Sequence, residues 1–549
     1  MNNMFPTTPE PINEPVRSYA PGSPERASLR STMKTMRDEH IDIPAFIDGK
    51  EVRTGTTLEI RAPHEHARLL GTAHQCGVNE LQSAVSSAVA ARNDWMHMDW
   101  TDRAAIFLKA ADLLAGPWRD TINASTMLGQ SKNPYQAEID AACELIDFFR
   151  FNVKFMEQIY KDQPISSPGI WNRVQYRALE GFVFAVTPFN FTSIAGNLPT
   201  APALMGNTVL WKPSSTQLHS AYYLYKMLEE AGLPKGVINM IPGRGSVVGN
   251  SIFSSEHFTG LHFTGSTKTF NFMWSTIGNN METYKTYPRV VGETGGKDFI
   301  VAHPSADPVA VGTAIVRGGF EYQGQKCSAA SRVYVPASLW PTIKDTVKAQ
   351  LDDIKMGPVE DFSNFVNAVI DRSAYDSISG YIAEAKASPD VEVVHGGNYS
   401  DEVGYFIEPT VLRTTNPKYR TMCEEIFGPV VSIFVYDDDK FDETLILLND
   451  TSPFALTGAV FAQDRSVLTH ATNVLNDCAG NFYLNDKPTG AVVGQQPFGG
   501  ARASGTNDKA GSPQNLLRWT SARSIKETFV PAKDYRYPFL ENDPTDIEL

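Results

Sequence analysis

A chain of 549 residues is too long for a single hydrophobic core, and 42% hydrophobic with 20% charged residues is typical of a globular protein with two or three domains. The net charge of -14 argues against nucleic acids and anionic membranes as general partners, and no apolar run reaches the roughly 18 residues that span a bilayer. The five cysteines form no C-x-x-C pair, which argues against a disulfide framework or structural zinc and favours a reducing compartment.

The first 40 residues are predicted to form an extended arm that ends in a short helix over residues 24–37. They are rich in Pro, Ser, Glu and Arg, and Glu10 and Glu14 place acidic groups in a segment without a long apolar core. A secretory signal needs such a core, and transit peptides are basic and poor in acidic residues. We therefore expect neither signal there.

Short apolar runs alternate with segments of helical spacing in the first half of the chain. A hairpin with an Asp-Gly turn is predicted at 45–52, and a strand at 171–179. Helices are predicted at 79–95, 102–115, 136–158, 218–231, 246–254 and 267–277. Buried strands are predicted at 181–186, 209–211, 237–241 and 260–263. This alternation predicts a parallel, doubly wound sheet.

A second series of strands is predicted in the second half of the chain. Its members are residues 299–301, 332–335, 391–394 and 430–435. The series predicts a second α/β domain, so the expected fold class is α/β.

Each apolar run in the first half is followed by a loop that suits ligand binding, because parallel sheets bind ligands at the carboxyl ends of their strands. These loops are 187–191 (TPFNF), 212–214 (KPS), 242–249 (PGRGSVVG) and 264–267 (TGST). The glycines of the third loop miss the standard dinucleotide fingerprint. Gly265-Ser266 at a helix start predicts a pyrophosphate site. Any one loop alone is better explained as an ordinary strand-helix turn.

The stretch 320–332 contains one cysteine, Cys327, with a cation before it and small or hydroxyl residues around it. A thiol attacks carbon as the thiolate, and a positive charge such as that of Lys326 lowers the thiol pKa. A nucleophile is therefore one interpretation of the pattern, although spacing alone does not favour it. The alternative is a buried core cysteine, the usual place of a free thiol.

Taken together and in order, the motifs resemble those of the aldehyde dehydrogenase superfamily. They are 188–191 (PFNF), 211–213 (WKP), 263–266 (FTGS), 293–297 (ETGGK), 324–327 (GQKC), 424–429 (EEIFGP) and 497–500 (PFGG). The resemblance implies a doubly wound cofactor domain, an α/β catalytic domain and a small β oligomerisation flap. It also implies that Cys327 is the nucleophile.

The resemblance assigns three catalytic residues and no metal ligands. Cys327 is expected to attack the aldehyde carbon. The side-chain amide of Asn190 and the backbone N–H of Cys327 would stabilise the oxyanion. Glu293 would activate the water that hydrolyses the thioester. The alternative for Glu293 is a solvated surface carboxylate, which its place before a Gly-Gly turn disfavours.

NAD is the cofactor that the resemblance implies, and nine residues are expected to bind it. They are Thr187, Lys212, Gly245, Gly265, Ser266, Thr267, Lys268, Thr269 and Glu425. Lys212 and Glu425 would hold the two riboses. Ser215 stands where many NAD-dependent relatives carry an acidic residue that grips the adenosine ribose, so use of NADP stays open.

Further stretches are similar to the branch of the family that oxidises glutamate 5-semialdehyde, the open form of 1-pyrroline-5-carboxylate, in proline catabolism. They are residues 13–16, 22–26, 144–152, 321–329, 489–509 and 518–520. This similarity implies substrate contacts from Ser328, Gly490, Ala491, Phe191, Phe498 and Glu144. A hydroxyl and two backbone amides would bind the carboxylate, and the two rings would enclose the methylenes. Core packing is the alternative for the rings.

The expected domains follow the same scheme. They are an arm (1–40), a cofactor domain (41–165 and 184–293), a catalytic domain (294–495), a return segment (496–517) and the flap (166–183 and 518–549). In the flap, 171–179 would pair with 522–529. The resemblance implies a homodimer or higher homo-oligomer without nucleic-acid or membrane partners. It implies the mitochondrial matrix in a eukaryote and otherwise the cytoplasm.

Three other functions stay open at this point. The chain could oxidise another semialdehyde, such as succinate semialdehyde. It could be a thiol hydrolase or acyl-transfer enzyme that uses Cys327 without redox chemistry, which the cofactor motifs disfavour. It could be a binding protein with an inactive site, which the complete set of Asn190, Glu293 and Cys327 disfavours.

Overall fold

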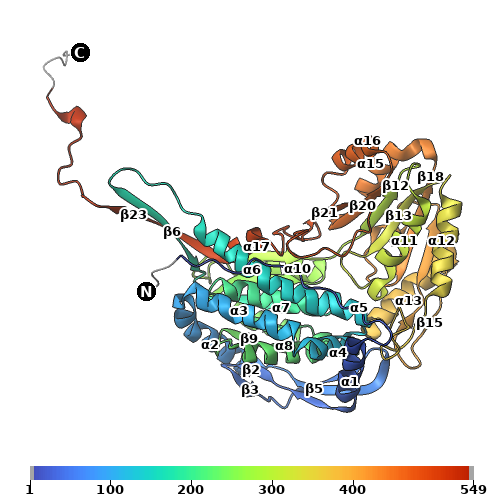
Figure 1. Ribbon diagram of the computed structural model, residues 1–549, viewed down its shortest axis with the longest axis horizontal. Helices are drawn as coiled ribbons and strands as arrows, with labels where there is room; N and C mark the ends of the chain where they lie inside the picture. The colour runs from blue at the N-terminus through green and yellow to red at the C-terminus, as the bar shows by residue number, and fades with distance from the viewer. Residues whose placement is uncertain (1–4, 543–549) are drawn as a thin grey trace.

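The computed structural model describes residues 5–542, in which two seven-stranded sheets form the two lobes of the molecule (Figure 1). The first sheet has the order β11-β10-β7-β8-β9-β2-β3. Its parallel strands are β7 (Phe182–Val186), β8 (Thr208–Lys212), β9 (Ile238–Met240), β10 (Phe258–Thr264) and β11 (Arg289–Glu293). The hairpin of β2 (Ala45–Ile47) and β3 (Lys50–Val52) joins it antiparallel, as the Asp-Gly turn predicted.

Side chains of the first sheet alternate between two cores, one on each face. Val183 and Ala185 belong to one core, and Phe182 and Phe184 to the other. The first face is covered by α3 (Trp100–Ala115), α4 (Arg119–Gln130), α6 (Glu144–Lys161), α7 (Thr192–Leu204) and α8 (Leu218–Ala231). The second is covered by α2 (Val78–His97), α9 (Gly245–Phe253) and α10 (Thr267–Asn279). Helices on both faces confirm the predicted doubly wound sheet.

The second sheet has the order β14-β17-β18-β13-β12-β20-β21. Its strands are β12 (Asp298–Ala302), β13 (Ala330–Pro336), β14 (Val391–His395), β17 (Thr410–Thr414), β18 (Val430–Tyr436), β20 (Thr457–Phe461) and β21 (Asn481–Leu484). The edge strand β14 is antiparallel to its neighbour. Helices α11 (Pro308–Phe320) and α12 (Trp340–Asp353) cover one face, and α15 (Phe441–Thr451) and α16 (Arg465–Val474) the other. This is the predicted second α/β unit.

Strands β6 (Ile170–Ala178) and β23 (Thr520–Thr528) pair antiparallel and project from the body, with residues 529–542 beyond them (Figure 1). The predicted pairing of 171–179 with 522–529 is therefore correct within two residues at each end. The domain boundaries and the oligomerisation role of this flap stay predictions. Within residues 5–542, no helix combines the length and apolarity needed to cross a membrane.

The described part of the chain contains further α-helices and β-strands. They are α1 (Pro24–Asp38), α13 (Arg372–Ala387), α14 (Arg420–Cys423), α17 (Pro513–Leu517), and the strands β1 (Ile41–Ile43), β4 (Thr57–Ala62), β5 (Glu65–His74), β15 (Tyr399–Ser400), β16 (Phe406–Ile407), β19 (Phe454–Ala455) and β22 (Ala501–Arg502). Helix α1 agrees with the prediction for residues 24–37.

The helix predicted at 136–158 is interrupted by a π-helical turn. It consists of α5 (Pro134–Ala137), the π-turn η1 (Glu138–Cys143) and α6. A π-turn inserts an extra residue per turn and is frequent at functional sites. Here it directs Glu138 and Asp140 into the interior, where both side chains are almost fully buried. Apolar spacing alone does not reveal such a shift, because the hydrophobic pattern continues on both sides of it.

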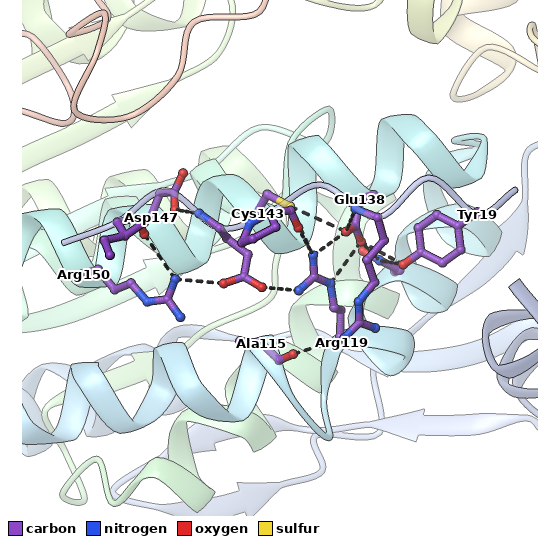
Figure 2. A network of polar contacts seen from close by, with 12 residues as sticks. Tyr19, Ala115, Arg119, Glu138, Cys143, Asp147 and Arg150 are labelled. Carbon is purple, nitrogen blue, oxygen red and sulfur yellow. Dashed lines mark hydrogen bonds and ion pairs between the residues drawn. The ribbon is translucent and has the colours of Figure 1, made fainter. Parts of the chain in front are cut away.

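The N-terminal arm, residues 5–20, runs along η1 and α6 and is fixed by buried ion pairs. The guanidinium of Arg119, 1% exposed, pairs with the carboxylates of Glu138 and Glu14. The phenol of Tyr19 donates a hydrogen bond of 2.8 Å to Glu138 (Figure 2). Removing one partner of a buried pair leaves an uncompensated charge, which costs about 3–5 kcal/mol. The arm is therefore an integral part of the folded body.

Candidate active site

Three predicted catalytic residues come together where the two sheets meet. Glu293 is the last residue of β11, Asn190 follows β7, and Cys327 lies in the turn before β13. The side-chain amide of Asn190 donates to the carbonyl oxygen of Gln325 at 3.1 Å, two residues before the cysteine. A Cβ atom on Gly296 would lie 2.2 Å from the carbonyl oxygen of Cys327. The Gly-Gly turn after Glu293 therefore packs directly on the cysteine loop.

The turn that presents Cys327 is strained and firmly held. In η3 (Glu321–Gly324), Tyr322 and Gln323 have positive φ angles of 51° and 55°. The phenol of Tyr322 donates to the carbonyl of Gln130 at 2.9 Å, and the amide of Gln323 donates to Ser131 and Ala368. Positive φ at a bulky residue costs of the order of 1–3 kcal/mol and persists where the surroundings enforce it. These contacts hold the cysteine loop in one conformation.

The expectation that Lys326 lowers the pKa of Cys327 is wrong. The ammonium group of Lys326 lies 3.4 Å from Asp140 and 3.9 Å from Glu321, so these carboxylates engage its charge. Burial and then the negative charges of Asp298 and Glu293 raise the pKa of Cys327 well above its usual value. Without a cofactor, the thiol is therefore protonated at neutral pH. The sequence neighbour of a cysteine need not be its spatial neighbour, which is why spacing misled here.

Glu293 has the environment of a buried general base. Burial raises its pKa well above the usual carboxyl value, while the positive charge of Lys509 opposes the shift. Its Oε2 atom is buried and accepts no hydrogen bond from any residue in the range 5–542. A Cβ atom on Gly499 would lie 3.0 Å from Glu293 Oε1. The alternative of a solvated surface carboxylate is therefore excluded, and an unpaired oxygen remains available to water.

Lys509 and Asp140 are residues of the site region that sequence reasoning missed. The ammonium of Lys509 donates to the carbonyls of Gly480 and Gly499, beside Glu293. Asp140 accepts from Lys132 at 2.8 Å and also faces Lys326. A lysine after a Thr-Asn-Asp stretch and an aspartate inside a predicted helix carry no local signal for these positions.

Most residues predicted to hold NAD lie along the carboxyl edge of the first sheet, and Glu425 comes from the segment between α14 and β18 of the second lobe. Burial lowers the pKa of Lys212, at the end of β8, to about 8, and its ammonium reaches only the carbonyl of Pro213 at 3.3 Å among residues 5–542. Burial likewise raises the pKa of Glu425 to about 7, and this carboxylate accepts from the backbone N–H of Gly296 at 2.8 Å. A nearly unpartnered buried cation beside a sheet edge fits a polar ligand with hydroxyl groups.

Helix starts line the same edge. Gly245 opens α9, and a side chain on it would meet nothing within 4 Å. Ser266 caps α10 through a hydrogen bond from the backbone N–H of Thr269. Two helix N-termini with open space before one of them suit a pyrophosphate. The residues present therefore fit NAD.

The remaining predicted cofactor residues are placed as follows. Thr187 accepts a hydrogen bond from the indole of Trp211 at 3.0 Å. The hydroxyl of Thr267 donates to the carbonyl of Ala503, and Lys268 and Thr269 are exposed on the first turn of α10. Gly265 precedes the cap of that helix.

The residues predicted to bind the substrate carboxylate adjoin Cys327. The hydroxyl of Ser328 shares a hydrogen bond of 2.7 Å with that of Thr489. Gly490 has a φ of +94°, and the backbone amides of Gly490 and Ala491 donate no hydrogen bond within the described residues. Two free amides beside a hydroxyl form a suitable concavity for an anion.

The other predicted substrate residues lie on neighbouring elements. Phe191 and Phe498 are half-buried, so neither ring is an ordinary core residue. The ammonium of Lys132 lies 4.4 Å from the Phe191 ring centroid. Glu144, on the first turn of α6, accepts from Ser193 at 2.6 Å, and burial raises its pKa to about 8.

Known proteins are similar in sequence to this chain over nearly its full length. The aldehyde dehydrogenase family model matches residues 50–525. The chain is 52% identical to the Delta-1-pyrroline-5-carboxylate dehydrogenase, mitochondrial, of Dictyostelium discoideum, over 97% of this chain and 96% of that one. It is 49% identical to the Homo sapiens protein of the same name, over 96% and 94%.

A solved structure agrees in fold as well as sequence. The Delta-pyrroline-5-carboxylate dehydrogenase from Mycobacterium tuberculosis bound with NAD superimposes with a TM-score of 0.95 at 53% identity, covering 98% of this chain and 100% of the other. With the family match over residues 50–525, these similarities show that the chain belongs to the aldehyde dehydrogenase family.

Proposed function

We propose that this protein oxidises L-glutamate 5-semialdehyde, which is in equilibrium with 1-pyrroline-5-carboxylate, to L-glutamate with NAD, the second step of proline catabolism. The observation that carries the proposal is the juxtaposition of Cys327, Glu293 and Asn190 with the hydroxyl of the next residue, Ser328, which is bonded to Thr489 at the start of the loop that bears the Gly490 and Ala491 amides. The names of the relatives from Dictyostelium and human support it, as does the NAD bound to the mycobacterial relative.

NAD would be held by Lys212 and Glu425 at its riboses and by the starts of α9 and α10 at its pyrophosphate. When bound, it supplies the hydride acceptor, and the positive charge of its oxidised ring lowers the pKa of a neighbouring thiol. The raised pKa of Cys327 without cofactor thus has a functional explanation. The thiol becomes reactive chiefly when the oxidant is present.

Oxidation begins when the thiolate of Cys327 attacks the aldehyde carbon and forms a thiohemiacetal. The developing oxyanion accepts hydrogen bonds from the side-chain amide of Asn190 and the backbone N–H of Cys327. Asn190 is 3% exposed and its amide is anchored on Gln325. Its orientation therefore needs no reorganisation during the reaction. Loss of hydride from the thiohemiacetal carbon leaves a thioester on the cysteine.

Hydrolysis of this thioester requires a base, and Glu293 takes that role. Its unpaired, buried Oε2 accepts a proton from the attacking water. The raised pKa makes it a stronger base than a solvated carboxylate, while Lys509 limits the rise. Collapse of the tetrahedral intermediate then releases glutamate and regenerates the thiol.

The head of the substrate is recognised by its charges. Its α-carboxylate binds the Ser328 hydroxyl and the amides of Gly490 and Ala491. The half-buried rings of Phe191 and Phe498 enclose the methylenes, and Glu144 supports the site from α6. Reduction of NAD by the purified protein with 1-pyrroline-5-carboxylate, compared with succinate semialdehyde, tests the substrate. A higher kcat/KM for succinate semialdehyde would contradict the proposal.

Ser328→Ala is expected to lower kcat/KM for glutamate semialdehyde about ten- to a hundredfold. A lost hydrogen bond to a charged group costs about 1.5–3 kcal/mol. Pentanal, an aldehyde of the same length without the carboxylate, should lose little. Steady-state kinetics with both aldehydes make the measurement. An equal loss on the two would mean that Ser328 only shapes the loop through its bond to Thr489.

Ser215→Glu is expected to weaken NADP binding much more than NAD binding. Ser215 is exposed just after β8, at the edge where Lys212 lies, and a carboxylate there would repel a 2′-phosphate. Titration calorimetry of both cofactors measures the effect, with Ser215→Gln as the uncharged control. An equal loss for both cofactors would place Ser215 away from the adenosine ribose.

A homodimer formed through the flap is part of the proposal. An isolated two-stranded ribbon is marginally stable in water, yet β6 and β23 project together from the body (Figure 1). Trp171, on β6, is 49% exposed. A second copy of the chain would cover this ribbon. The relatives from Dictyostelium and human are named mitochondrial, so we place the protein in the mitochondrial matrix if its source is a eukaryote and otherwise in the cytoplasm.

A further inference from the structure

We propose that Asn13, in the N-terminal arm, is a positioning residue for substrate binding that clamps the loop of residues 489–496 onto α6. This inference rests on the proposed function, because the same loop carries the amides of Gly490 and Ala491. Asn13 does not reach the substrate. It acts by holding the loop that does.

Asn13 joins the loop to α6 through its side-chain amide. One hydrogen of this amide is donated to the carboxylate of Asp147 on α6 at 2.8 Å. The other is donated to the carbonyl of Val493 in the loop, also at 2.8 Å. Its oxygen accepts from the side-chain amide of Gln495 at 2.9 Å. Both hydrogens and the oxygen are therefore used, and two of the three bonds go to the loop.

The arm around Asn13 is rigid enough to act as a clamp. The next residue, Glu14, pairs with Arg119 and Arg150, and its backbone N–H donates to Asp147 at 2.7 Å. Figure 2 shows Asp147, Arg150 and Arg119 lying in one continuous network along the arm. Asn13 is thus fixed from both α6 and its own backbone.

Part of the loop depends on this anchor, because Gly490 and residues 494–496 are exposed, although Val493 is 6% exposed and packs in the core that includes α6. At its start, Thr489 bonds to Ser328, and its carbonyl accepts from Lys487 at 2.9 Å. Near its end, Gly494 has a φ of +82° and lies so close to Phe151 of α6 that a Cβ would be 2.1 Å from the ring. Between these points, Gly490 is exposed, and its amide and that of Ala491 donate to no group among the described residues.

The physical consequence concerns preorganisation. Amides that are already fixed bind a carboxylate without the entropy cost of ordering the loop. Releasing the loop from Asn13 therefore weakens binding of the carboxylate head group. It leaves Cys327, Glu293 and Asn190 in place, because their contacts do not involve the arm.

Asn13→Ala in the NAD-saturated enzyme is expected to raise KM for glutamate semialdehyde about fivefold, the effect of about one hydrogen bond. We expect kcat and the KM for pentanal to stay within about twofold. Gln495→Ala should give a similar selective rise. The double variant should show little additional loss, since both changes break the same link.

Thr8→Val is the matched control. Its hydroxyl ties the arm to Glu157 farther along α6 and has no contact with the loop, so KM for both aldehydes should not change. Hydrogen exchange gives an independent readout. The amides of 489–496 should exchange faster in Asn13→Ala and at the parent rate in Thr8→Val.

Equal increases in KM for both aldehydes in Asn13→Ala would contradict the proposal that Asn13 holds the loop. Unchanged hydrogen exchange of the loop amides in this variant would also contradict it. Ser328→Ala, measured in parallel, separates this failure from failure of the proposed function. A carboxylate-selective loss at Ser328 with none at Asn13 rejects the clamp alone. Absence of selectivity at Ser328 rejects the carboxylate assignment, and the exchange rates still decide whether Asn13 holds the loop.

Discussion

Replacing Cys327 by serine is expected to lower kcat for aldehyde oxidation by on the order of 10⁴-fold or more, because removal of a catalytic nucleophile leaves only the contributions of binding and oxyanion stabilisation. Serine preserves the size of the side chain, and its hydroxyl is not appreciably ionised at neutral pH. The strained η3 turn and the Gln325 carbonyl that anchors Asn190 do not involve the thiol. The loss would therefore be chemical rather than structural.

The measurement is steady-state NAD reduction together with cofactor binding by calorimetry. NAD affinity should be retained, since Lys212 and Glu425 make no contact with the sulfur. Cys423→Ser is the matched control, because Cys423 is also partly exposed but lies outside the proposed chemistry. It should keep activity within about threefold. Substantial oxidation by Cys327→Ser would remove the cysteine from the mechanism.

Glu293→Gln is expected to slow steady-state turnover by about 10²–10⁴-fold, the usual contribution of a general base, while leaving acylation possible. Each active site should then release one equivalent of reduced cofactor in a burst and stall as the thioester. Rapid-mixing absorbance measures the burst, and mass spectrometry of the intact protein should find the acyl group on Cys327. Unchanged turnover would show that Glu293 is not the required base.

The role of Glu293 also predicts the direction in which the rate of deacylation changes with pH. Only the carboxylate form of Glu293 can accept a proton, and its pKa lies well above the ordinary value because of burial. The rate of deacylation in the parent enzyme should therefore increase as the pH rises through the raised pKa of Glu293. At pH values below that pKa the rate should be low. Glu293→Gln should lack this limb of the profile. Lys509→Met removes a charge that stabilises the carboxylate and should move the limb to higher pH.

Local patterns were sufficient for the α/β architecture. Runs such as 182–186 are wholly apolar because both faces of a parallel sheet are buried, and this is visible in sequence. Asn190 and Lys212 follow such runs, so the strand pattern alone placed them on one edge. The roles of Cys327 and Glu293 came from motifs that resemble a family and stay predictions, while the structure brings the Gly-Gly turn after Glu293 against the Cys327 loop.

Other features depended on contacts between distant segments. Helix α7 contains Pro199 and Pro202, which by local rules break a helix. It forms nonetheless because nearly all its residues are buried between α6 and the first sheet. The local sequence likewise showed no sign of the π-turn η1. This turn is stabilised by an ion pair between its Glu138 and Arg119, which lies on another helix.

The sequence by itself thus determined the α/β architecture, most of the strands of the first sheet and four of the seven strands of the second sheet. Only the tertiary structure decided where Lys326 points, how far burial raises the pKa of Cys327, and that Asn13 reaches the substrate loop. The physical reason is the separation along the chain over which each effect acts. Periodicity and turn chemistry act between near neighbours in the chain, whereas desolvation and ion pairing depend on which distant groups the fold brings within a few ångströms.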